Sequence, residues 1–144
     1  MSITIALLLS MTACEGSGGG GAQQQTEDQD TAIGGGVDNL APSLEHTEVV
    51  SPQSASGYVS ITATIFDENA IVNTAIYYRP QTSASWSSLG MTAQGPDVYI
   101  GTLGPAEMQS GGMHYYIEAV DQYGNVGTLP DGAPNDYFKF DLVE

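Results

Sequence analysis

Short runs in which apolar and polar residues alternate are the feature that most restricts how this chain can fold. The clearest run alternates serine or threonine with apolar residues at Val59, Ile61, Ala63 and Ile65. Since successive side chains of a β-strand point to opposite faces of a sheet, this period of two indicates a half-buried strand. No comparable helical period of about 3.6 residues appears in the chain. The sequence therefore predicts an all-β domain.

Further candidate strands follow the same rule. Two runs each place four side chains on one face, which we expect to be buried: Val72, Thr74, Ile76 and Tyr78, and Met113, Tyr115, Ile117 and Ala119. Weaker candidate strands are residues 44–50, 86–91, 98–103 and 137–143. Clusters of Gly, Pro, Asn and Asp between the runs are typical of turns. About seven short strands in roughly 100 residues predict an immunoglobulin-like β-sandwich, with a small open barrel as the alternative.

The segment YYIEAVDQYGN at residues 115–125 narrows the fold. It resembles the penultimate strand of fibronectin type III and related bacterial immunoglobulin-like modules, and residues 67–79 resemble their second and third strands. The resemblance covers roughly residues 41–143 and implies the same sandwich. We expect Asp121 and Gly124 to form the turn after this strand, because a carboxylate can accept backbone N–H groups and glycine tolerates a positive φ.

Residues 14–40 have the composition of a flexible linker. They contain four consecutive glycines at 18–21, three glutamines at 23–25 and three glycines at 34–36. Such a segment buries too little apolar surface to offset the entropy lost on ordering. We therefore predict a tether over residues 14–40 that precedes a folded domain over residues 41–144.

Cys14 is the only cysteine of the chain and follows the apolar run at residues 3–13. An apolar stretch that ends in two small residues and a cysteine resembles the lipobox of bacterial lipoproteins. The resemblance implies that residues 1–13 are a signal peptide and that acyl chains on Cys14 anchor the protein in a lipid bilayer. The run is shorter than the roughly 20 residues of a membrane span and fits a signal peptide. Glu15, in place of an aspartate, favours the outer membrane of the bacterial cell envelope.

The charge of the chain excludes one class of partner. There are 17 acidic residues and two basic ones, Arg79 and Lys139, for a formal net charge of −15. Binding of nucleic acid requires clustered Lys and Arg to displace counterions from phosphates. We therefore expect no nucleic-acid partner.

The chain lacks the residue patterns of an enzyme. His46 and His114 have neither a cysteine in the domain nor a third histidine to complete a zinc site. No serine lies in a Gly-x-Ser-x-Gly motif, and no glycine-rich loop between a strand and a helix is present to bind phosphate. We predict a protein that is not an enzyme and that needs no cofactor.

Acidic and amide residues in two predicted turns form a weak candidate site for calcium. In an immunoglobulin-like sandwich these turns lie at the same end, and here they carry Asp67, Glu68, Asp121 and Asn125. Calcium binds six to eight oxygen ligands of this kind. Because Asp and Asn are also common turn residues, we favour no metal site.

Aromatic residues form a second weak candidate site, for a sugar or a peptide. The candidates for exposed rings are Tyr77, Trp86, Tyr99 and Tyr116. The alternative is that these rings cover the edges of the sandwich and keep only their polar tips in water.

These patterns predict a lipid-anchored envelope protein that presents a non-catalytic module. Its expected role is structural or adhesive contact with another envelope protein or a glycan. The alternative is a ligand-binding module for carbohydrate or calcium.

Overall fold

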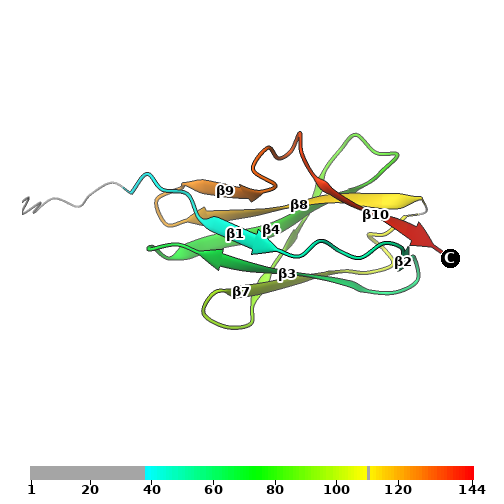
Figure 1. Cartoon of the computed structure of the whole chain (residues 1–144), viewed down its shortest axis with the longest axis horizontal. Helices are drawn as coiled ribbons and strands as arrows, with labels where there is room; N and C mark the ends of the chain where they lie inside the picture. The colour runs from blue at the N-terminus through cyan, green and yellow to red at the C-terminus, as the bar shows by residue number, and fades with distance from the viewer. Residues whose placement is uncertain (1–37, 110) are drawn as a thin grey trace, which may run out of the picture. The chain divides into compact units, whose positions relative to one another are not determined.

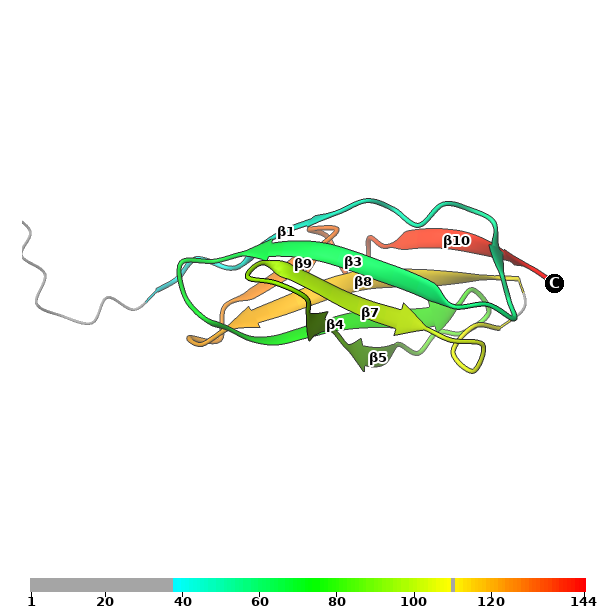
Figure 2. The same ribbon diagram turned by 90° about the horizontal axis from the view of Figure 1, so that it is seen from below.

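The computed structural model describes residues 38–109 and 111–144, which form ten β-strands in two sheets and no helix (Figures 1 and 2). The prediction of an all-β domain is confirmed. The strands outnumber the seven or so expected partly because two of them, β2 (Gln53–Ser54) and β6 (Thr92–Ala93), are only two residues long. The predicted signal peptide, Cys14 and residues 15–37 of the predicted linker lie outside the described residues.

No helix in the described part of the chain is both long and apolar enough to cross a membrane.

The smaller sheet has four antiparallel strands. Its order is β1 (Ser43–His46), β3 (Val59–Phe66), β7 (Val98–Leu103) and β6. The alternation in β3 has the predicted effect, with these four apolar residues buried: Val59, Ile61, Ala63 and Ile65. The serine and threonines between them lie on the outer face.

The larger sheet has six strands. Five of them follow the order β2, β10 (Phe138–Val143), β8 (Gly112–Asp121), β4 (Ile71–Pro80) and β5 (Ser87–Gly90). The sixth, β9 (Val126–Leu129), pairs with the second half of β8. It lies on the same edge of β8 as β10, next to Phe138, where β10 begins. The pairing of β2 with β10 is parallel, and the other pairings are antiparallel.

The hydrophobic core lies between the two sheets. Its largest fully buried apolar side chains come from both: Ile61, Ile65, Ile76, Leu103, Met113, Tyr115, Ile117 and Phe140. The sheets approach closely at Gly101, where an added Cβ would collide with the Ile76 side chain. The buried face predicted for β8 is confirmed, since its inward residues are almost inaccessible to solvent.

One predicted face is wrong at its first residue. Val72 is 62% exposed, although the sequence placed it on the buried face with Thr74 and Ile76. The pairing of β4 with β8 shifts by one residue between Ile71 and Asn73. A bulge of this kind inserts an extra residue and reverses the alternation. Ile71 packs against the core instead.

The chain changes sheets near its start. After pairing with β3 as β1, it leaves at His46 and joins β10 as β2 at Gln53, so the connecting segment runs between β3 and β10 (Figure 1). β7 pairs with β3 from Val59 to Thr64, whereas β1 pairs with β3 only from Ala63 onward. The first half of β3 therefore has no strand on its second edge within the described residues.

Candidate binding surfaces

The turn after β8 is built as its sequence predicts. Asp121 is only 1% exposed, and its Oδ1 accepts the backbone N–H groups of Tyr123 and Asn125 at 2.8 Å each. Gly124 has a φ of 86°, in the region that favours glycine. Burial alone would raise the pKa of the Asp121 carboxyl, but the hydrogen bonds from Asn125, Tyr123 and Gly124 outweigh it and lower that pKa.

Three carboxylates meet at this end of the sandwich. Asp38, Asp67 and Asp121 each place an oxygen within 4.8 Å of the others, and we call this group the carboxylate cluster. Two asparagine amides hold it together. Asn69 Nδ2 donates to Asp38 Oδ2 at 2.7 Å, and Asn125 Nδ2 donates to Asp121 Oδ2 at 2.7 Å.

The structure thus brings together three of the four residues suggested for calcium. Asp67, Asp121 and Asn125 converge, whereas Glu68 is exposed and does not belong to the cluster. Asp38 was missed because the sequence placed it in the linker. It contacts the domain through Asn69 and also through its carbonyl oxygen, which accepts Asn125 Nδ2 at 3.0 Å.

The hydrogen bonds of the carboxylate cluster decide what it can do. Its oxygens are of the type that binds a hard cation. However, the Asn69 and Asn125 amides already donate to Asp38 and Asp121, and backbone N–H groups donate to Asp67 and Asp121. These donors supply part of the positive potential that an ion would otherwise provide.

Aromatic rings gather on the outer face of the larger sheet. Tyr77 of β4 is the cross-strand neighbour of Tyr116 of β8, and their rings stack at 4.8 Å with an interplanar angle of 2°. Tyr77 Oη also donates to Glu118 Oε1 at 3.2 Å. The Trp86 ring meets the Tyr116 ring edge-on at 5.0 Å. Each ring therefore covers part of another.

Arg79 lies among these rings. Its Cζ is 4.2 Å from the centre of the Trp86 ring and 5.1 Å from that of Tyr137, distances typical of cation–π contacts. Its Nη1 donates to the Ala84 carbonyl oxygen at 3.3 Å. Its Nε is buried and has no hydrogen-bond partner among the described residues.

The only two basic residues of the chain lie on either side of His114. Arg79 on β4 and Lys139 on β10 are both cross-strand neighbours of His114 on β8. Burial lowers the pKa of His114, and the charges of Arg79 and Lys139 lower it further. This face thus carries both basic residues of a strongly acidic protein among aromatic rings, with the Glu118 carboxylate beside Tyr77. We call it the Arg79 face; it comprises Tyr77, Arg79, Trp86, His114, Tyr116, Tyr137 and Lys139.

The sequence identified three members of the Arg79 face and one residue that lies elsewhere. Tyr77, Trp86 and Tyr116 come together, but Tyr99 lies on β7 in the other sheet and packs against the core. The period of two in β4 was a usable signal for Arg79, because it puts Arg79 on the same face as Tyr77.

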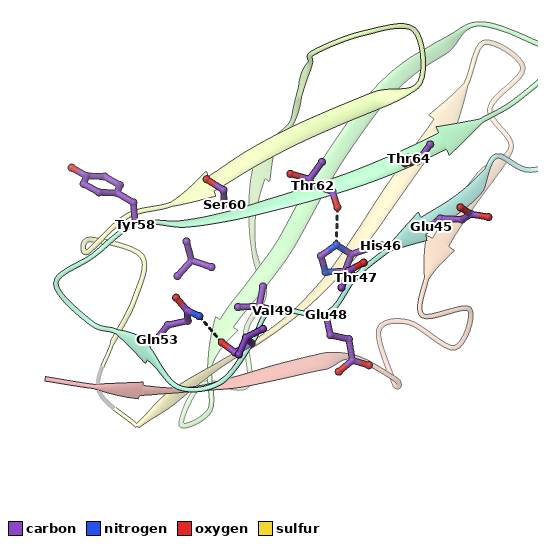
Figure 3. Close-up of a pocket in the computed structure, with 12 residues that line it drawn as sticks. Glu45, His46, Thr47, Glu48, Val49, Gln53, Tyr58, Ser60, Thr62 and Thr64 are labelled. Carbon is purple, nitrogen blue, oxygen red and sulfur yellow. Dashed lines mark hydrogen bonds between the residues drawn. The ribbon is translucent and has the colours of Figure 1, made fainter.

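His46 is part of a hydrogen-bond network that joins the two sheets, and Figure 3 shows its bond to the Thr62 carbonyl oxygen. Its Nδ1 is 2.7 Å from the Thr62 carbonyl oxygen, so Nδ1 carries the hydrogen and Nε2 accepts the Tyr115 hydroxyl at 2.8 Å. Tyr115 Oη accepts the Val49 N–H in turn, at 3.1 Å. Burial lowers the pKa of His46 and raises that of Tyr115 to about 12. Both side chains therefore stay neutral near pH 7.

No protein-family model and no curated protein matches this chain. Among solved structures, it is similar to the endo-beta-1,4-mannanase from Thermotoga petrophila, with a TM-score of 0.52 and 14% sequence identity over 74% of this chain. The match spans only 21% of the mannanase chain. At this identity the likeness concerns the fold alone.

Proposed function

We propose that this chain is a bacterial envelope lipoprotein of the outer membrane, anchored by acylated Cys14, that presents a non-catalytic immunoglobulin-like module of fibronectin type III kind. The module contacts another protein of the envelope through the Arg79 face. Two packed sheets with a first strand that changes sheets support the choice of a sandwich over an open barrel.

The Arg79 face is the observation that carries the interaction. Trp, Tyr and Arg dominate the binding energy of protein interfaces, and this face groups all three. The guanidinium is held between two rings, and its hydrogen bond is to a main-chain carbonyl rather than to a carboxylate. A carboxylate of a partner would gain charge-assisted hydrogen bonds here. Such a partner would otherwise be repelled by the acidic remainder of the surface.

Carbohydrate binding is the competing proposal for the same face. A sugar stacks on a free aromatic ring face, but Tyr77 and Tyr116 lie parallel and cover each other. Tyr116 is only 7% exposed, with the Trp86 edge against it. The ring arrangement therefore favours a protein partner over a sugar. Calcium binding by the carboxylate cluster is the other alternative.

Capture from solubilised envelope tests the proposal with matched variants of the full chain. Arg79→Gln and Trp86→Ala remove the charge and the ring, and Val72→Ala, an exposed site outside the Arg79 face, is the control. We expect one envelope protein whose recovery falls about tenfold in the first two variants and is unchanged in the control, as for an interface hot spot. Recovery of a glycan that depends on Trp86 but not on Arg79 would establish the carbohydrate alternative. Equal recovery of every component by all three variants would refute a role for this face.

A further inference from the structure

A groove borders the open edge of β3, which is the edge opposite to the one that pairs with β7. The groove lies between the first half of β3 and the segment that leads from β1 to β2 (Figure 3). Its volume is about 660 Å³, and His46 bridges the gap between the two walls by its bond to the Thr62 carbonyl. We call it the β3-edge groove.

Main-chain groups of β3 face into this groove. In an antiparallel strand the N–H and C=O of one residue point to the same side, and the side alternates along the chain. The Thr62 carbonyl accepts His46 Nδ1, so Thr62 points its main-chain groups to the open edge, and Ser60 does the same. The described residues provide no strand that pairs with Ser60 on this side. Such an edge is a template for a further strand.

The side chains around the groove indicate the chemistry of an occupant. Val50 and Tyr58 are 76% and 77% exposed, and both line the groove. Glu45 and Glu48 line it as well, and no Lys or Arg does so. His46 adds no positive charge near pH 7 because its pKa is lowered by burial. The groove is therefore polar along its strand edge, apolar at Val50 and Tyr58, and negatively charged.

We propose that the β3-edge groove binds an extended, basic peptide segment of a partner protein, which adds to β3 as a strand through the main-chain N–H groups of Ser60 and Thr62 and the Ser60 carbonyl, because the Thr62 carbonyl already accepts His46 Nδ1. Main-chain hydrogen bonds to β3 provide the pairing, and Lys or Arg side chains of the segment reach Glu45 and Glu48. A second copy of this chain is a poor occupant, because each copy carries a formal charge of −15 and has only two basic residues. The proposal is independent of the Arg79 face.

A defined peptide tests the proposal by NMR on the ¹⁵N-labelled full chain. The probe is a peptide of about six residues in which valine and lysine alternate. A strand advances about 3.3 Å per residue, so a peptide of this length can lie along the open half of β3. We expect it to shift the amide signals of Ser60 and Thr62 and to slow their hydrogen exchange. The same peptide with alternate backbone nitrogens methylated keeps its charge but loses pairing, so its affinity should fall about tenfold or more. A valine–glutamate peptide should not bind.

Variants of the chain separate pairing from charge. Ser60→Pro removes the N–H that faces the groove, at an edge position where proline is tolerated, and should weaken the lysine peptide about tenfold. If Ser60→Pro fails to fold, the double variant Glu45→Gln with Glu48→Gln takes its place, with the exposed Glu68→Gln as the control. Equal binding of the methylated and unmethylated peptides, or shifts confined to the Trp86 indole, would overturn the proposal. Absence of binding by the folded wild type would do so as well.

Discussion

The pair formed by His46 and Tyr115 shows how one side chain connects two sheets. His46 is the last residue of β1, Tyr115 belongs to β8 in the other sheet, and the hydrogen bond between their side chains connects the two sheets. Tyr115 is fully buried and its hydroxyl also accepts the Val49 N–H. The network thus provides hydrogen-bond partners for His46 and for the Val49 N–H of the segment that follows β1. Without such partners these polar groups would lose hydrogen bonds to water when the protein folds.

This network predicts that stability depends on pH. The pKa of His46 is lowered in the folded state, so the unfolded state binds a proton first as the pH falls. The contribution of His46 to the free energy of unfolding should therefore be fully present above about pH 6.5, and the free energy of unfolding should decrease as the pH falls below that value. Burial lowers the pKa of His114 as well, so both histidines contribute in the same direction. Urea unfolding between about pH 7 and pH 5 measures the effect.

The variant His46→Gln identifies the contribution of the network. It should reduce the slope of stability against pH without abolishing it, because His114 still titrates. An unchanged slope in His46→Gln would contradict the prediction.

Two adjacent residues of β8 should differ strongly in their effect on stability. Ile117 is completely buried between the sheets, so Ile117→Ala should lower the free energy of unfolding by about 2–5 kcal/mol. Glu118 lies on the outer face and accepts one hydrogen bond, from Tyr77, so Glu118→Ala should cost about 1 kcal/mol or less. Chemical denaturation of the two variants provides the comparison. Equal costs would show that the two residues do not alternate between core and solvent.

At the scale of elements, the turns after β3 and β8 are in contact with the segment that precedes β1. Asp67, Asp121 and Asp38 belong to these three segments, and the amides of Asn69 and Asn125 connect them. The stability of this end of the sandwich thus depends on donors that come from different turns.

The carboxylate cluster predicts a small response to calcium. A calcium site with a Kd near 10⁻³ M would add roughly 1.4 kcal/mol when calcium is at about ten times that concentration. We expect less, a rise in Tm of under about 2 °C beyond that of matched ionic strength, because amides already donate to Asp38 and Asp121. Thermal unfolding with and without millimolar calcium checks this. A larger, saturable rise that disappears in Asp67→Asn with Asp121→Asn would assign the protein to the ion-binding class.

At the scale of the whole molecule, anchoring and recognition are assigned to different parts of the chain. The proposed anchor is Cys14, and both proposed contact surfaces belong to the described domain. If Cys14 carries acyl chains, Cys14→Ser should move nearly all of the protein from the membrane fraction to the soluble one, because two or more chains are needed for stable anchoring. Fractionation followed by mass measurement of the mature N-terminus tests this. Membrane association that persists in Cys14→Ser would refute the lipoprotein proposal.

Local patterns of the sequence determined the strands and much of the core. The period of two placed Val59 to Ile65 and Met113 to Ala119 correctly, because alternation follows from backbone geometry alone. The turn at Asp121 and Gly124 was also predictable, since its hydrogen bonds join residues close in the chain. The same rule failed at Val72, where a bulge that depends on pairing with β8 reversed the alternation.

Only the tertiary structure decided which distant residues meet. The sequence does not indicate that Asp38 joins Asp67 and Asp121, because their contact depends on how three segments come together at one end of the sandwich. Nor does it show that Arg79 and Lys139 lie on either side of His114, which follows from the register of three strands. The period of a strand is a property of its own backbone, whereas register and the meeting of turns result from packing the sheets into one core.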